Sequence, residues 1–312
     1  MSKKRIVVAI GRIGFGDSFP EQKINIKKAA KAIADLVEED YQVLITHSNG
    51  PQIGMLHSSL TEYSKAHKEH TVAPLSVCSA LSQGYMGYDL QNMIRTELLN
   101  RGIFRTVVTL ITQVKVDPFD KAFRSPTKTI GRYMTEEEAL LEKEKGNHVI
   151  FKEGKGYRRV IASPKPLEVY EIDAIKTLLD GNQVVIAGGG GGIPVLEQGS
   201  VLKGASAVIE KDYTSELLAH NVGADTLLFL TDTKKVLLQF GTDNEEAINN
   251  INLSLAKQYV SEGQFEEGSM LPKINASIDF LSKNPNGHAI ISHIEDALSA
   301  VNGKTGSHIT IE

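Results

Sequence analysis

The sequence predicts an α/β protein with a largely parallel central sheet and helices on both of its faces. Short apolar, β-branched runs recur along the whole chain, and they lack the strict in–out alternation of a strand with one solvated face. Between these runs, apolar residues repeat at helical spacing. Strand and helix therefore alternate from one end to the other, which is the pattern of a parallel sheet covered by helices.

The positions of the expected strands fix where a ligand would bind. In chain order they are 6–10, 43–46, 107–111, 184–187, 226–231 and 288–291. The expected helices are 24–37, 175–179, 217–222 and 274–281. The first of them places six apolar residues on one stripe: Ile26, Ala29, Ala30, Ile33, Leu36 and Val37. Ligands of such folds bind beyond the carboxyl ends of the strands.

The segment 117–166 interrupts this alternation. It is polar and charged, with a Glu and Lys run at 136–145 and a short apolar patch at 149–151. It is too long for an ordinary connection between elements of a compact domain. We expect it to form a protruding subdomain or lid, followed by a second lobe.

Composition and charge narrow the class of protein. The chain has 312 residues, of which 41% are hydrophobic and 23% charged, enough for one large core or two joined lobes. No apolar run approaches the ~20 residues that cross a bilayer. The basic start and five apolar residues before Gly11 are too short for a signal peptide, so we expect a first core strand and no membrane partner.

The cysteine, charge and histidine patterns exclude further classes. The single cysteine, Cys78, rules out an intrachain disulfide and a cysteine-rich metal site, which favours a reducing, cytoplasmic location. A net charge of −4 argues against general nucleic-acid binding. The nine histidines show no His-Glu-x-x-His spacing, so a zinc hydrolase has little support, and no metal ligand is assigned.

Three glycine-rich turns follow three of the expected strands, at 11–16, 46–54 and 188–192. Glycine tolerates positive φ and lets backbone amides point at an anion. A single turn of this kind is explained equally well by a tight strand-to-helix connection. Five consecutive glycines at 188–192 carry an entropic penalty of roughly 0.5–1 kcal/mol each, which favours close approach of a ligand. Three converging turns suit a substrate with several phosphate oxygens.

Two familiar phosphate-binding motifs fail on spacing. Gly11, Gly14 and Gly16 read G-x-x-G-x-G, the reverse of the dinucleotide fingerprint. Gly303-Lys304-Thr305 resembles the end of a P-loop, but the required first glycine falls at Leu298, and the segment follows a helix instead of a strand.

Lys128, Lys211 and Lys273 stand beside turn-like or glycine-bearing sequence, and Lys273 lies at the expected start of a helix capped by Ser269. A phosphoryl group in transfer spreads negative charge over its oxygens, and positioned cations lower that barrier. Asp212, next to Lys211, either orients a lysine or helps to hold magnesium. The alternative is that these are solvated surface residues and that Asp212 forms an ordinary ion pair.

Nine segments together resemble carbamate kinase: 46–54, 82–88, 112–117, 126–128, 157–160, 189–195, 208–212, 230–232 and 268–273. They occur in order between about residue 5 and residue 310. As a set they are specific, and they distinguish carbamate kinase from the acetylglutamate, aspartate and uridylate kinases of the same superfamily.

The resemblance implies an open three-layer α/β/α sandwich with a mostly parallel central sheet and a protruding lid subdomain. It implies a single amino-acid-kinase-like domain over 1–312, with a carbamate or carbamoyl-phosphate lobe at 1–175, including the protrusion at about 117–166, and a nucleotide lobe at 176–312. It also implies a cytoplasmic homodimer, Mg²⁺, and reversible transfer between ATP plus carbamate and ADP plus carbamoyl phosphate. In arginine fermentation this family runs the reaction toward ATP.

The resemblance also implies roles for individual residues. The catalytic set is Lys128, Lys211, Lys273 and Asp212. The substrate and phosphate set is Gly11, Arg12, Ser48, Asn49, Gly50, Gly189 and Gly190. The nucleotide set is Lys211, Asp232, Met270 and Lys273.

The sequence departs from the family in the first turn. The family has Gly-Gly-Asn where this chain has Gly11-Arg12-Ile13, and it usually has glycine where this chain has Ser48. Arg12 either adds a cation that grips phosphate or fills space that the substrate needs, and Ile13 cannot make an asparagine's hydrogen bonds. Two hypotheses follow: an active carbamate kinase, and a weakened or repurposed nucleotide-binding relative.

Overall fold

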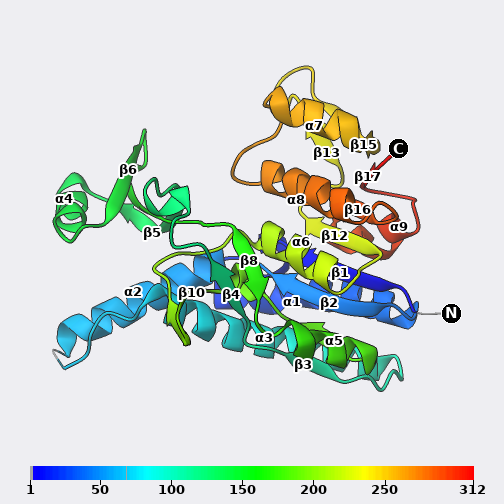
Figure 1. Cartoon of the computed structure of the whole chain (residues 1–312), viewed down its shortest axis with the longest axis horizontal. Coiled ribbons are helices and arrows are strands. Elements are labelled where there is room, and N and C mark those ends of the chain that lie inside the picture. Colours follow the sequence, from blue (N-terminus) through cyan, green and yellow to red (C-terminus); the bar gives the residue numbers. More distant parts are fainter. Residues whose placement is uncertain (1–2, 68) are drawn as a thin grey trace.

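The computed structural model describes residues 3–67 and 69–312, and it has the expected α/β architecture (Figure 1). The central sheet has the strand order β15-β17-β16-β12-β1-β2-β9-β3. Its neighbouring strands pair in parallel except β16 and β17. The strands are β1 (Arg5–Ile10), β2 (Gln42–His47), β3 (Val107–Thr109), β9 (Val184–Ile186), β12 (Thr226–Thr231), β15 (Asn250–Asn252), β16 (His288–His293) and β17 (Ser307–Thr310).

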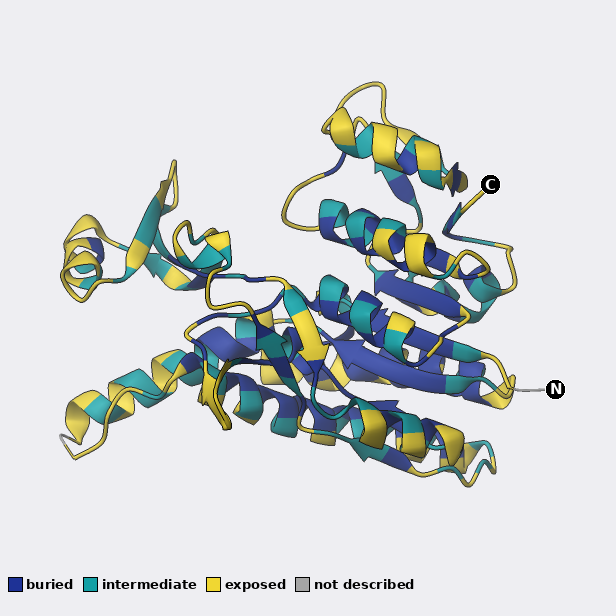
Figure 2. Cartoon of the chain, in the orientation of Figure 1, coloured by how far each residue is buried: buried dark blue, intermediate teal, exposed yellow. Residues whose placement is uncertain are grey.

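Both faces of this sheet are buried, which explains why its strands lack alternation. In β1, Ile6, Val8 and Ile10 join the core on one face, whereas Val7 and Ala9 join the core on the other. Buried residues are continuous through the strands and the inner sides of the flanking helices (Figure 2). The fold class predicted from the sequence is confirmed.

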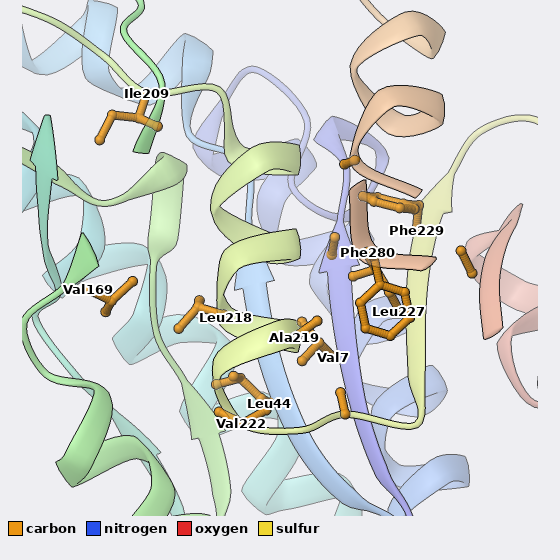
Figure 3. Packing of buried hydrophobic residues seen from close by; sticks show 14 of the residues in the cluster. Val7, Leu44, Val169, Ile209, Leu218, Ala219, Val222, Leu227, Phe229 and Phe280 are labelled. Atoms are coloured by element: carbon orange, nitrogen blue, oxygen red, sulfur yellow. The ribbon is translucent and has the colours of Figure 1, made fainter. Parts of the chain in front are cut away.

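The helices form two layers. On the face of Ile6 lie α1 (Phe19–Glu38), α3 (Leu75–Asn100) and α9 (Ala297–Val301). On the face of Val7 lie α5 (Ile172–Asp180), α6 (Lys211–Asn221) and α8 (Met270–Lys283), with α7 (Leu253–Ser261) packed on α8. Figure 3 shows this second layer, where Leu218 and Ala219 of α6 and Val222 directly after it face the strand residues.

Besides the main sheet, the described residues form a two-stranded sheet of β13 (Val236–Leu238) and β14 (Glu246–Ile248) and two further sheets that bear on the site. The first contains β11 (Val201–Gly204), β10 (Ile193–Gln198), β4 (Gln113–Val116) and β8 (Pro166–Val169), in that order. The second is antiparallel and contains β5 (Lys128–Met134), β7 (Gly156–Ile161) and β6 (His148–Lys152), with α4 (Glu136–Glu144) beside it. We call residues 128–161 the lid. In Figure 1 the lid stands away from the central sheet, near α2 (Gly50–Ala66).

Several elements differ in length from the sequence-based expectation. Helix α1 begins earlier, at Phe19, because Ser18 and Glu21 form a capping box and Pro20 occupies the first turn. Helix α6 begins at Lys211 instead of 217, and α8 begins at Met270 instead of 274. Ser269 does occupy the N-cap position of α8, but its hydroxyl bonds Glu266 and makes no cap hydrogen bond. Among the described residues, no helix combines the length and apolarity that a membrane span requires.

Candidate active site

The three glycine-rich turns meet at the carboxyl edge of the central sheet. Strand β1 lies between β2 and β12, and β9 pairs with β2, so the loops that follow these strands are neighbours. Backbone bonds tie the loops together: the Gly11 amide donates to the Leu230 carbonyl at 2.8 Å, and the Ser48 amide to the Ile10 carbonyl at 3.0 Å. The parallel topology therefore brings distant segments of the chain to one place.

The five-glycine turn is packed against protein atoms. Gly188, Gly190, Gly191 and Gly192 all have positive φ. A Cβ at Gly190 would overlap the Asn49 amide, and one at Gly189 would overlap the His47 ring. The expectation that a ligand's close approach explains these glycines is therefore incomplete, because the protein's own side chains approach them equally closely.

This turn also presents backbone donors. The amide of Gly188 bonds Thr112 Oγ1 at 2.9 Å, and those of Gly191 and Gly192 bond carbonyls within the turn. Among the described residues, no hydrogen bond uses the amides of Gly189 and Gly190. An oxyanion beside Gly190 would therefore find backbone N–H groups.

Lys211 and Lys273 share one buried carboxylate. Lys211 Nζ lies 2.6 Å from Asp212 Oδ1, and Lys273 Nζ lies 3.1 Å from Asp212 Oδ2. Lys211 and Asp212 are 7% and 2% exposed, so this cluster holds two positive charges against one negative charge away from bulk water. The arrangement leaves an excess of positive charge for an anion to neutralise.

Burial and pairing shift the pKa values of this cluster. Burial lowers the pKa of the Lys211 ammonium, against the attraction of Asp212. Burial acts to raise the pKa of Asp212, but Lys211 and Lys273 outweigh it and hold that pKa below the ordinary value. Asp212 is therefore ionised at neutral pH.

Lys128 approaches the same region from the lid. Its ammonium pairs with Glu210, the residue before Lys211. Both lysines line one cavity, which we call the transfer cavity, together with Ser48, Asn49, Gly50, Ile53, Thr129, Ile130, Ile161, Gly190, Val208, Ile209 and Glu210. Lys273 does not line this cavity, and its link to Lys211 is the shared carboxylate of Asp212.

A second cavity, of about 220 Å³, adjoins Lys273. It is lined by Asp232, Thr233, Lys235, Leu237, Phe240, Gln264, Phe265, Glu266, Ser269 and Met270, and we call it the nucleotide-side cavity. Lys273 Nζ donates to the Ser269 carbonyl at 2.9 Å while it also contacts Asp212. Lys273 thus contacts Ser269, which lines this cavity, and Asp212, the partner of Lys211, and the predicted residues Asp232 and Met270 lie together in the lining.

Arg12 and Ile13 take different environments. Arg12 is exposed, and its guanidinium makes two bonds to the Asp17 carboxylate, one of them from Nε at 2.5 Å. Ile13 packs against the hydrophobic core on the α1 side of the sheet. The Ile13 side chain therefore packs in the core, whereas the Arg12 guanidinium is exposed to solvent.

Sequence reasoning assigned no individual role to Gln83 and Ser82, which support the glycine turn and Asn49. Gln83 Nε2 donates to the Gly189 carbonyl at 3.0 Å, and Gln83 Oε1 accepts from the Thr112 amide at 2.8 Å. Asn49 Nδ2 donates to Ser82 Oγ at 2.7 Å. Buried polar side chains on α3 thus fix the turn, and the available signal for them was Ser and Gln within an otherwise apolar buried face.

The described residues contain no group of three or more His, Cys, Asp or Glu side chains that could hold a metal ion. Both oxygens of Asp212 accept hydrogen bonds from lysine ammonium groups. A divalent ion at this site would therefore depend on ligand atoms from a bound substrate.

Comparisons with known proteins agree over the full length of the chain. Residues 4–291 match the amino acid kinase family. The carbamate kinase-like protein YqeA of Escherichia coli is 46% identical over 309 residues, covering 99% of each chain. A carbamate kinase of Staphylococcus epidermidis is 43% identical, covering 98% of this chain and 99% of the relative. The structure of carbamate kinase from Giardia lamblia bound to AMP-PNP has a TM-score of 0.92 and 34% identity, covering 99% of each chain.

Proposed function

This chain belongs to the amino acid kinase family, and we propose that it is a carbamate kinase, transferring a phosphoryl group reversibly between ATP and carbamate. The observation that carries the proposal is the buried Lys211–Asp212–Lys273 cluster beside the glycine-rich turn. The full-length similarity to carbamate kinases does not favour the alternative of a repurposed binding protein.

The proposed transfer is in line. One oxygen of carbamate forms a bond to the γ-phosphorus while the bond from that phosphorus to the β–γ bridging oxygen of ATP breaks. Lys211 and Lys273 neutralise the charge on the transferring group and the leaving ADP, and Asp212 holds both ammonium groups in position. Carbamate already carries a nucleophilic oxygen, so the step needs no general base.

The substrates divide between the two cavities in this proposal. The carbamate end lies in the transfer cavity near Ser48, Asn49 and Gly50, and Lys128 closes over it from the lid. The nucleotide extends past Lys273 into the nucleotide-side cavity. Gly189 and Gly190 supply amide donors to phosphate oxygens. The Gly11 amide already donates to the Leu230 carbonyl, so Gly11 supplies no donor.

We propose that Mg²⁺ enters with the nucleotide. When bound, it would neutralise part of the charge on the phosphate oxygens of the nucleotide. The residues of this chain fit such a shared ion and not a protein-built centre, because the carboxylates beside the site are already paired with ammonium groups: Glu210 with Lys128, and Asp212 with Lys211 and Lys273.

We also propose a homodimer, in the cytoplasm, that forms ATP from carbamoyl phosphate during arginine breakdown. The support for a dimer is an apolar surface on adjacent helices α1 and α3, where Phe19, Ile24, Val77, Leu81 and Tyr88 are each at least 45% exposed. Analytical ultracentrifugation tests it: the wild type sediments as a dimer, and Leu81→Asp shifts the population toward monomer. A wild-type monomer at micromolar concentration would contradict it.

The activity itself is tested with purified protein, ADP and Mg²⁺. Carbamoyl phosphate is offered as the phosphoryl donor, and acetyl phosphate at the same concentration is the control. We expect ATP formation, followed by luciferase luminescence, to depend on carbamoyl phosphate. Equal rates with the two donors, or no ATP from either, would overturn the assignment.

A further inference from the structure

A third cavity lies between the core and the lid, next to the transfer cavity. Its lining comes from the first turn, from the start of α2 and from lid strands β5 and β7. Ser48, Gly50 and Thr129 line both this cavity and the transfer cavity, so the two cavities are adjacent. Three arginines line it, Arg12, Arg132 and Arg158, and within the described lining Asp17 is the acidic residue.

Each arginine is held differently. Arg158 lies in the lid, where its Nε donates to the Gly131 carbonyl at 2.9 Å and its guanidinium lies 5.2 Å from the Tyr133 ring centroid. Arg132 pairs with Glu138 within the lid. Arg12 is the arginine contributed by the core, and its partner Asp17 lines the same cavity.

From this geometry we propose that the cavity is an anion subsite for a small phosphate-bearing molecule, gripped from the core by Arg12 and from the lid by Arg158. The proposal rests on the proposed function and deepens it: the subsite receives the phosphate group of carbamoyl phosphate on its way to the transfer cavity. Guanidinium groups bind phosphate oxygens through two parallel N–H donors, which suits this role.

Asp17 acts as an exchangeable partner of Arg12. In the structure the Asp17 carboxylate occupies the donors of Arg12 that a phosphate would use. Both side chains are substantially exposed, 64% and 47%, and exposed ion pairs are weak, so a dianion displaces the carboxylate readily. The Asp17 amide, and not its side chain, bonds Glu21, so the loop keeps its anchor when the carboxylate is removed.

An anion in this cavity would contact both the core and the lid. Arg12 and Ser48 belong to the core, whereas Arg158 and Thr129 belong to the lid, so the bound phosphate draws the lid onto the core. Arg12 thereby adds affinity for the substrate that a shorter, uncharged side chain at this position would not supply.

Steady-state kinetics with Arg12→Gln tests the proposal. We expect the KM for carbamoyl phosphate to rise at least about fivefold, with the KM for ADP and kcat within about threefold of wild type. Asp17→Asn, which frees Arg12, lowers the KM for carbamoyl phosphate or leaves it unchanged. The matched control is Arg95→Gln, an exposed arginine on α3, which changes none of these values.

Inorganic phosphate separates the subsite from the catalytic reaction. We expect phosphate to inhibit competitively against carbamoyl phosphate in the wild type and to inhibit less in Arg12→Gln, which shows that the subsite accepts free phosphate as well. Competition that is equal in both proteins, or an unchanged KM for carbamoyl phosphate in Arg12→Gln, would overturn the subsite. If the wild type makes no ATP, calorimetric titration with phosphate still decides it: weaker binding by Arg12→Gln than by Arg95→Gln supports the subsite, and equal binding contradicts it.

Discussion

Asp212 is the residue on which the geometry of the two buried lysines depends. Its carboxylate touches both ammonium groups; Lys211 and Asp212 are buried, and the Lys273 side chain is 12% exposed. Removing one partner of a buried ion pair leaves an uncompensated charge, which is far more costly than losing an exposed pair.

We therefore expect Asp212→Asn to lower the free energy of unfolding by about 3 kcal/mol at pH 7. Urea denaturation followed by circular dichroism measures this. Asp243→Asn, at an exposed position, is the matched control and should change stability little. Equal stability of the two variants would show that the cluster is solvated and not a buried charge network.

His47 gives the site a predictable pH response. Burial lowers its pKa from 6.5 to about 4, so the folded protein keeps the ring neutral where the unfolded chain already binds a proton. The contribution of His47 to the free energy of unfolding is fully present above pH 6.5. It falls by about 3 kcal/mol as the pH drops to 4. Denaturation at pH 7.5, 5.5 and 4 should show a smaller decline for His47→Gln than for wild type.

The exposed His148→Gln is the control, and its pH profile should follow the wild type. A wild-type decline that His47→Gln leaves unchanged would assign the acid sensitivity to other groups.

The sequence singled out the three lysines and Asp212 because each lies beside glycine, proline or a helix start, and their catalytic roles stay a prediction. Glu210, the partner of Lys128, could not be found this way. Their pairing joins the lid to α6 across 82 positions of sequence, and such a contact follows from the tertiary fold and not from local spacing.

At the scale of elements, the glycine turn shows how structure and function share the same residues. Gly190 has φ +64°, and a Cβ there would overlap the buried Asn49 side chain. Gly199 has the same φ of +64° but has open space where a Cβ would lie. The two positions separate backbone strain from packing.

We expect Gly199→Ala to cost about 1 kcal/mol of stability with activity retained, because only the left-handed conformation is penalised. Gly190→Ala should cost at least about 2 kcal/mol more and lower kcat at least about tenfold, since the Asn49 side chain must give up its hydrogen bond to Ser82. Thermal unfolding and the ATP-formation assay measure both effects. Similar behaviour of the two variants would remove the packing argument.

The strands were predictable because a sheet buried on both faces produces continuous apolar runs. Helices α2 and α3 were not identified. The buried face of α3 includes Ser79, Ser82, Gln83 and Gly87, so its apolar stripe is broken. Gly87 lets α3 approach Thr109 of β3 closely, a requirement of packing that periodicity does not reveal.

For the whole molecule, the sequence predicted a parallel sheet with a protruding insertion, and the sheet is confirmed. The division into a carbamate lobe and a nucleotide lobe stays a prediction, as does closure of the lid. What the sequence did not reveal is that the lid supplies arginines to a cavity shared with the first turn. That arrangement depends on how the lid packs against the core, which local sequence patterns do not show.

The central claim is that buried ammonium groups beside the glycine turn stabilise a phosphoryl group in transfer. The most direct measurement is kcat for ATP formation from ADP and carbamoyl phosphate in Lys211→Ala, beside the exposed Lys203→Ala. We predict a fall of at least about a hundredfold for Lys211→Ala and a wild-type rate for Lys203→Ala. A Lys211→Ala rate within about threefold of wild type would contradict the account.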